Sequence, residues 1–284
     1  MHHATKTIVL IHGLYVTPRS WEHFRSFFEA RGNHVLTPSW PRMHGEVEEI
    51  RQDPSALAGL GLWEIADHYA AIIDGLDEPP ILMGHSLGGL IVQMLLDRGY
   101  GRVGVAIDSA TPKGIYRLPL SVLRSSRSVL SNPLNYWRTV ALTYENFRYA
   151  FAHVMPESEA REAYRNYVVP GPGRPIVEVA FGNFNPWAVN RVNFRAGGRV
   201  PLLLIAGEKD HLVPAVLNKI NHRLYRRSPA LTAFKEFPGR SHLIIAQAGW
   251  QEVADYALTW AQTAIARDET ETAARTTPRS LVSL

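Results

Sequence analysis

The segment Pro80–Leu90, PILMGHSLGGL, joins an apolar run to a helix-like pattern. The apolar run Pro80–Met83 predicts a buried strand, and Leu87–Arg98 predicts the helix that follows it. Ser86 therefore lies in a sharp turn between strand and helix, with a glycine two residues away on either side. The pattern G-x-S-x-G in this context is typical of a serine nucleophile, but the five residues alone fit a glycine-rich turn equally well.

The rest of the chain repeats this alternation of strands and helices. Short, continuously apolar runs are separated by helix-like stretches; they include Thr7–Ile11, Val103–Ile107, Leu202–Ala206 and Thr232–Phe237. Such runs are typical of strands that are buried on both faces. The expected fold is therefore α/β, with a mostly parallel central sheet between two layers of helices.

The alternation is interrupted once, and this divides the chain into parts. Residues 116–195 contain helix-like stretches rich in aromatic side chains and no clear apolar strand, so we expect an inserted helical subdomain. Residues 1–115 and 196–266 form the two parts of the core. Residues 267–284 are polar and lack periodicity, and we expect this tail to be poorly ordered.

Composition excludes several classes of function. The 284 residues carry a formal charge of only +4 with scattered arginines, so we expect no nucleic-acid partner. The absence of cysteine excludes disulfides, thiol catalysis and thiolate metal sites. The twelve histidines show no H-E-x-x-H spacing, so no metal is expected. No signal segment or membrane span is evident, which favours a cytoplasmic protein without a membrane partner; oligomeric state stays open.

A serine hydroxyl needs a base to remove its proton, and the base is usually a histidine oriented by a carboxylate. Asp210 follows the strand Leu202–Ala206, and His242 follows Thr232–Phe237. Because parallel strands end at the same edge of a sheet, both side chains are expected near Ser86. Asp108 also ends a predicted strand and is the alternative acid.

The backbone around the first predicted strand offers hydrogen-bond donors. His12-Gly13-Leu14-Tyr15 follows Thr7–Ile11, and the amide of Leu14 could help to stabilise an oxyanion. The amide of Leu87, directly after the serine, would be the second donor. His12 is expected to brace this loop through hydrogen bonds.

Together these segments resemble the α/β-hydrolase superfamily from about residue 7 to residue 266. The residues that carry the resemblance are His12-Gly13, Gly84–Gly89, Leu202–Asp210 and Gly239–His242. The resemblance implies that Ser86 is the nucleophile, Asp210 the acid and His242 the base, with Leu14 and Leu87 at the oxyanion positions. It also implies that residues 116–195 cap the active site, and that no cofactor is needed.

The expected reaction is acyl transfer on a carboxylic ester or lactone. Family members that open epoxides or remove halogens use aspartate as nucleophile, and the serine argues against both. Tyr15, Trp40 and Met43 are candidates for the walls of an apolar substrate pocket. The stretches around Ser86 and Asp108 also resemble a bacterial subgroup that is similar to macrolide esterases. Perhydrolases, C–C bond hydrolases, hydroxynitrile lyases and slow ligand sensors share the same constellation and remain alternatives.

Overall fold

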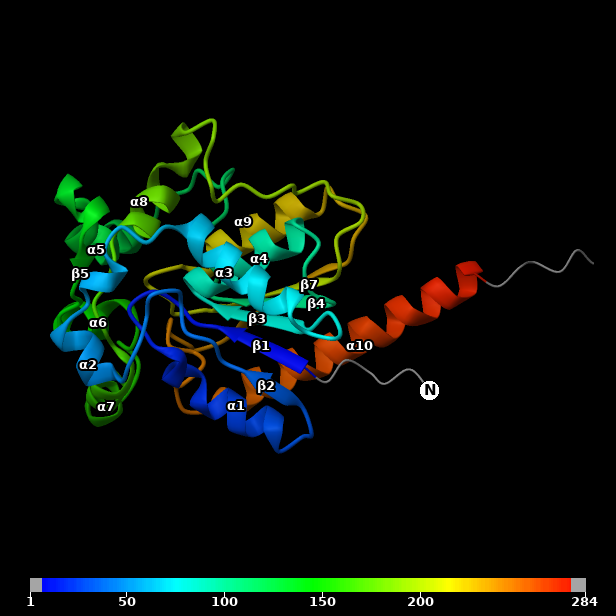
Figure 1. Ribbon diagram of the computed structural model, residues 1–284, viewed down its shortest axis with the longest axis horizontal. Coiled ribbons are helices and arrows are strands. Elements are labelled where there is room, and N and C mark those ends of the chain that lie inside the picture. The colour runs from blue at the N-terminus through cyan, green and yellow to red at the C-terminus, as the bar shows by residue number, and fades with distance from the viewer. Residues whose placement is uncertain (1–6, 277–284) are drawn as a thin grey trace, which may run out of the picture.

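The computed structural model describes residues 7–276. Its centre is a six-stranded parallel sheet with the order β2-β1-β3-β4-β7-β8 (Figure 1). The strands are β1 (Thr7–Ile11), β2 (His34–Leu36), β3 (Ile81–His85), β4 (Val103–Ile107), β7 (Leu202–Gly207) and β8 (Thr232–Phe237). The expected fold class is thereby confirmed.

Helices cover both faces of the sheet. On one face lie α1 (Glu22–Glu29) and α10 (Trp250–Thr276); on the other lie α3 (Leu62–Asp74), α4 (Leu87–Asp97) and α9 (Ala215–Tyr225). The alternation of side chains along a strand explains the two layers. In β1, Ile8 and Leu10 pack with α1 and α10, whereas Val9 and Ile11 pack with α3 and α4. Burial on both faces is why these strands are continuously apolar.

The chain between β4 and β7, residues 108–201, leaves the sheet and is called the insertion below. It contains α5 (Leu120–Leu130), η3 (Pro133–Trp137), β5 (Thr139–Val140), α6 (Tyr144–Ala150), α7 (Glu157–Tyr167), β6 (Gly171–Pro172), α8 (Arg174–Phe181) and η4 (Gly182–Phe184). Shorter elements precede β3; they are η1 (Pro18–Trp21), α2 (Val47–Gln52) and η2 (Ser55–Leu57). Helices α5–α8 lie beyond the carboxyl ends of the strands (Figure 1).

The last helix extends into the segment that was predicted to be the tail. The apolar pattern ends near residue 266, but α10 continues to Thr276. Alanine, arginine and glutamate are frequent in this stretch and favour a helix without an apolar face. Residues 277–284 of the expected tail lie outside the described part. Between residues 7 and 276, no helix has the length and apolarity that crossing a membrane requires.

The turn between β3 and α4 depends on close backbone contacts. A Cβ atom on Gly84 would lie 2.1 Å from the carbonyl oxygen of Gly88. A Cβ on Gly88 would lie 2.1 Å from the carbonyl oxygen of Ile11, in the neighbouring strand. Glycine at both positions therefore lets α4 start directly against β3 and β1.

We expect Gly84→Ala to lower the free energy of unfolding by about 3 kcal/mol or more, because the obstructing atoms belong to backbone. Gly198→Ala is the matched control, since no atom lies within 4 Å of the added Cβ. Its effect should stay within about 0.5 kcal/mol. Urea unfolding of the two variants measures both values, and equal stabilities would contradict the close-contact explanation.

Candidate active site

Ser86 lies at the junction of β3 and α4 in a strained backbone conformation. Its φ and ψ are 57° and −120°, and the residue is buried. Tyr15, in the loop after β1, and Asp108, directly after β4, also have positive φ, at 68° and 44°. Non-glycine residues rarely adopt such values, and strain of this kind concentrates at functional sites. The turn presents Ser86 at the carboxyl edge of the sheet.

Asp210 and His242 form a direct contact at the ends of β7 and β8. The Nδ1 atom of His242 donates to Oδ2 of Asp210 over 2.6 Å, and both side chains are buried. The other carboxylate oxygen of Asp210 accepts from the amides of Leu212 and Val213, at 2.7 and 2.8 Å. Three donors thus hold this carboxylate in one orientation.

The second ring nitrogen of His242, Nε2, is buried and has no hydrogen-bond partner within residues 7–276. This is the nitrogen that the sequence prediction pairs with Ser86. No hydrogen bond joins the two side chains in the described structure. Bonds between nucleophile and base are often long before substrate binds.

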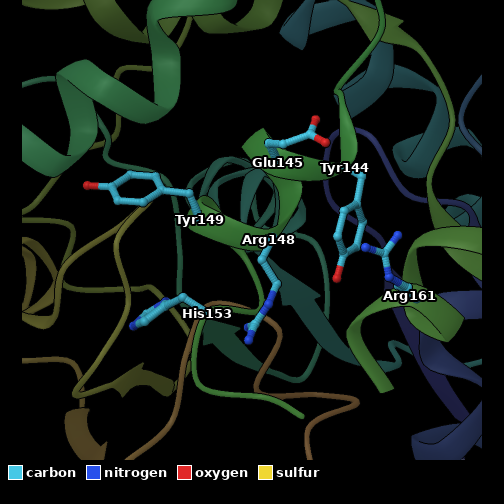
Figure 2. A pocket seen from close by; sticks show the side chains of 6 residues that line it. All are labelled: Tyr144, Glu145, Arg148, Tyr149, His153 and Arg161. Carbon is cyan, nitrogen blue, oxygen red and sulfur yellow. The ribbon is translucent and has the colours of Figure 1, made fainter. Parts of the chain in front are cut away.

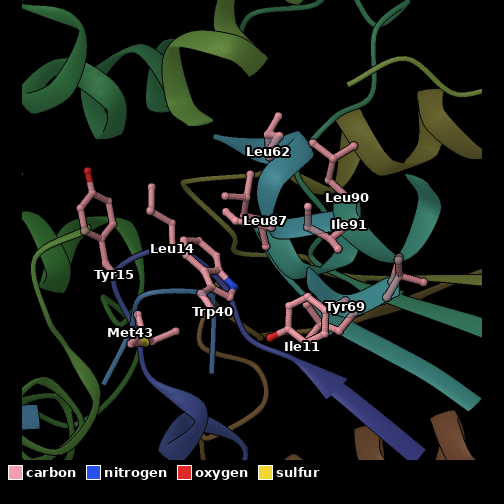
Figure 3. Close-up of a cluster of buried hydrophobic side chains, with 14 of the residues drawn as sticks. Ile11, Leu14, Tyr15, Trp40, Met43, Leu62, Tyr69, Leu87, Leu90 and Ile91 are labelled. Carbon is pink, nitrogen blue, oxygen red and sulfur yellow. The ribbon is translucent and has the colours of Figure 1, made fainter. Parts of the chain in front are cut away.

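The loop His12–Tyr15 lies directly against the turn that carries Ser86. A Cβ on Gly13 would come within 2.9 Å of the Cβ of Ser86, so only glycine permits this approach. Leu14 directly follows Gly13 in the sequence, and Leu87 directly follows Ser86. Both leucines lie close together in the buried cluster of Figure 3. The structure therefore brings both predicted oxyanion residues to the side of Ser86.

His12 stabilises that loop. Its Nδ1 donates to the carbonyl of Gly13 over 2.9 Å, and its ring stacks on Trp40 with the centroids 4.9 Å apart. Burial lowers the pKa of His12 to about 4, so the ring is neutral near pH 7. A neutral ring can pack against Trp40 without a counter-ion.

The sequence-based prediction of the site did not include two contacts of His242. The Nε2 of His85 donates to the backbone carbonyl of His242 over 2.7 Å, and burial holds the pKa of His85 well below its usual range. Phe151, in the insertion, meets the ring of His242 edge-on at 4.8 Å between centroids. His85 lies inside the serine pentapeptide and could have been considered, whereas no spacing relates Phe151 to the site.

Asp108, the alternative acid, has a different partner. Its Oδ1 accepts from the amide of Gly207 over 2.6 Å, and its Oδ2 is buried without a described partner. Burial, and secondarily the charge of Asp210, raises the pKa of Asp108 well above its usual range. Asp108 therefore ionises less readily than a free carboxyl group, and its hydrogen bond with Gly207 anchors the end of β7.

Asp108 also belongs to a group that resembles a metal site. One atom each of His85, Asp108 and His242 lies within 4.8 Å of the others. The contacts described above already use Nε2 of His85 and Nδ1 of His242. Nδ1 of His85, Oδ2 of Asp108 and Nε2 of His242 have no hydrogen-bond partner within residues 7–276.

The three predicted pocket residues lie in the buried cluster next to Leu14 and Leu87. Tyr15, Trp40 and Met43 are all less than 7% exposed (Figure 3). Burial raises the pKa of the Tyr15 hydroxyl, which has no described partner, so the hydroxyl stays protonated. These side chains belong to the same buried apolar cluster as Leu14 and Leu87.

The insertion contacts both sides of the site. The amide of Val169 donates to the carbonyl of Tyr15 over 2.9 Å, and the neighbouring Val168 forms an antiparallel bridge with Val16. On the other side, the amide of Leu243 donates to the carbonyl of Phe151 over 2.9 Å. The insertion is thus joined to the oxyanion loop and to the loop of His242.

A separate cavity of about 510 Å³ lies in the insertion (Figure 2). It is lined by residues that each carry a polar or charged group: Tyr144, Glu145, Arg148, Tyr149, His153 and Arg161. Ser86, Asp210 and His242 do not line it. His153 stacks on His211 with centroids 3.7 Å apart, and its pKa is lowered to about 4 chiefly by burial. This cavity is distinct from the predicted catalytic centre.

Comparison with known proteins supports the fold. A model described as the alpha/beta hydrolase family matches residues 8–256. No curated protein matches the sequence. A polyneuridine aldehyde esterase variant superposes with a TM-score of 0.65 and 15% identity, over 90% of this chain and 98% of the other.

Two further solved structures are similar. A pyrethroid hydrolase from Sphingobium faniae JZ-2 gives a TM-score of 0.63 at 19% identity, over 90% and 97% of the two chains. A monoacylglycerol lipase from Paleococcus ferrophilus gives 0.62 at 18%, over 92% and 96%. At these identities the likeness shows the fold alone.

Proposed function

Since this chain belongs to the alpha/beta hydrolase family, we propose that it is a serine hydrolase that cleaves a carboxylic ester or lactone through an acyl-enzyme intermediate. The observation that carries the proposal is the 2.6 Å contact between Asp210 and His242 at the strand edge where Ser86 is held. An oriented histidine beside a strained serine is what acyl transfer requires.

In the first half of the reaction, Ser86 attacks the substrate carbonyl and Nε2 of His242 accepts the hydroxyl proton. The negative charge that develops on the carbonyl oxygen is stabilised by the amides of Leu14 and Leu87. Asp210 remains ionised, keeps Nδ1 of His242 protonated and stabilises the imidazolium. His242 then gives the proton to the departing alcohol, which leaves an acyl-Ser86 ester.

In the second half, His242 removes a proton from water, and the resulting nucleophile attacks the acyl-Ser86 ester. The tetrahedral intermediate collapses, Ser86 recovers its proton from His242, and the carboxylic acid leaves. For a lactone substrate, alcohol and acid remain in one molecule, so the product is the substrate plus one water.

The insertion acts as a cap in this proposal. Its contacts with Tyr15 and with Leu243, in the loops on two sides of Ser86, support this role. Tyr15, Trp40 and Met43 would contact the acyl part of the substrate, because they form an apolar wall next to Leu14. An apolar wall favours an uncharged ester or a large lactone, and a macrolide ring is the narrowest version of this proposal.

The experiment is a substrate panel analysed by mass spectrometry. We expect short p-nitrophenyl esters to release nitrophenol, and at least one macrolide to gain the mass of one water. A gain for no macrolide would refute the macrolide specificity alone. If no ester and no lactone were hydrolysed, the hydrolase proposal would be refuted. A ligand sensor or a hydroxynitrile lyase would then be favoured.

A further inference from the structure

The insertion exposes large apolar side chains on neighbouring elements. Leu118 lies just before α5, Leu120 and Leu123 in α5, Trp137 in η3, Phe181 at the end of α8, and Phe184 and Trp187 in and after η4. These seven residues are called the apolar face. Leu120, Phe184 and Trp187 are more than 80% exposed. Monomeric proteins rarely expose so many large apolar groups in one region without a partner.

Hydrogen bonds join the elements of this face. The side-chain amide of Asn183 in η4 accepts from the backbone of Gly114 and donates to that of Ile115, both at 2.7 Å, just before α5. The amide of Gly173, before α8, donates to the carbonyl of Arg138, after η3, over 3.0 Å. Helices α5 and α8 pack side by side (Figure 1). The exposed apolar residues are therefore carried by neighbouring elements of the insertion.

The same surface is positively charged. Residues 109–144 contain no aspartate or glutamate, and neither do residues 179–207. Five glutamates lie between these two stretches. Four of them, Glu145, Glu157, Glu159 and Glu162, belong to α6 and α7, which carry no residue of the apolar face. The carboxylate of the fifth, Glu178, is bonded to Arg174 and to the amide of Leu62. The exposed residues Arg117, Arg127 and Arg138 form no salt bridge with any residue of the described chain.

Helix α5 combines both properties on one stripe. Leu123, Arg124 and Arg127 follow Leu120 by three, four and seven residues, and all four are exposed. On a helix this spacing puts them on one side, while Val129 faces the core. The guanidinium carbon of Arg124 lies 3.8 Å from the ring centroid of Tyr149, whereas Arg127 forms no salt bridge within the described chain. Apolar groups beside arginines on one side are typical of helices that lie in the interface of an anionic membrane.

An apolar groove opens on this surface. It has a volume of about 410 Å³ and lies between the end of α5, η3 and α8. Trp137 and Phe181 of the apolar face contribute to its lining, together with Val129 and Val177. An apolar groove of this kind can hold part of an acyl chain.

We propose that the apolar face docks on the surface of a bilayer that contains anionic phospholipid. The arginines would contact the phosphate groups, and the apolar side chains would enter the interface. A second copy of the chain fits less well, because a symmetric contact would oppose the arginines of two copies without acidic residues between them. Docking of this kind does not require a membrane-spanning helix. The expectation that there is no membrane partner was based only on finding no such span in the sequence.

The experiment measures cosedimentation with vesicles of phosphatidylcholine alone and of phosphatidylcholine mixed with phosphatidylglycerol. We expect binding to the mixed vesicles only, and weaker binding at high salt. Arg117→Gln combined with Arg127→Gln should weaken binding by about tenfold or more. Leu120→Ser combined with Leu123→Ser should weaken it as well.

The matched control is Arg226→Gln combined with Arg227→Gln, which removes the same charge from exposed positions after α9. It should bind like the wild type. These three double variants should hydrolyse a water-soluble ester at the wild-type rate, which shows that they are folded. Ser86→Ala should bind vesicles normally, so failure of the proposed catalysis and failure of docking are distinguishable.

Three results would overturn the proposal. The first is that the wild type does not bind to mixed vesicles. The second is that the wild type, the double arginine variant at Arg117 and Arg127, and the double leucine variant bind equally well. The third is a concentration-dependent dimer in analytical ultracentrifugation that the Leu120 and Leu123 substitutions disrupt, since the face would then be an interface between two copies.

Discussion

Replacing Ser86 with alanine is expected to reduce the hydrolysis of p-nitrophenyl butyrate by about 10⁴- to 10⁶-fold, because the hydroxyl is the proposed nucleophile. Alanine keeps a Cβ at the same place, so the strained backbone at φ 57° is not altered further. The loss should appear in kcat with intact folding. Steady-state kinetics and urea unfolding of wild type and variant measure the two effects.

The control for this substitution is Ser109→Ala. Ser109 is also a buried serine, at the end of β4, and its hydroxyl is bonded to Gln93. It should lose stability with little change in kcat. Equal rates of wild type and Ser86→Ala would refute the serine mechanism.

The second large effect is expected at Asp210 and separates it from Asp108. Asp210→Asn should reduce kcat by about 10⁴-fold, because an amide cannot stabilise the His242 imidazolium or hold its tautomer. Asp108→Asn should reduce kcat less than about tenfold, since Asp108 does not contact the ring of His242 through a hydrogen bond and asparagine still offers an oxygen to the Gly207 amide.

Kinetics of both variants against one ester decide between the two acids. If Asp108→Asn were the inactive variant and Asp210→Asn retained activity, the acid would belong to β4 instead of β7. A large fall in both rates would show that the Asp108 contact is required to position the β7 loop, so unfolding curves accompany the kinetics.

The strands and the ends of the loops could be predicted from the sequence. Runs such as Val103–Ile107 are buried on both faces, and this makes them recognisable without knowledge of their neighbours. Parallel strands share one edge, so Ser86, Asp210 and His242 could be assigned to that edge before any distance was known. The 2.6 Å contact between Asp210 and His242 agrees with that assignment.

Other features depend on tertiary contacts that no local pattern encodes. Phe151 and His242 are in contact although more than ninety residues separate them in the sequence. The carbonyl group that accepts from His85 is that of His242, in the loop after β8. The exposure of the leucines in α5 could not be predicted either, because apolar residues at helical spacing normally indicate a face that packs on the core. The continuation of α10 to Thr276 reflects helix propensity alone and leaves no apolar period to detect.

The central claim is that Ser86 carries the acyl group, and covalent labelling tests it most directly. The protein is incubated with an alkyl fluorophosphonate, digested, and its peptides are analysed by mass spectrometry. The proposed mechanism predicts one phosphonyl adduct, on Ser86, and far slower labelling of the His242→Ala variant. An active protein that stays unmodified, or that carries the adduct on a different residue, would contradict it.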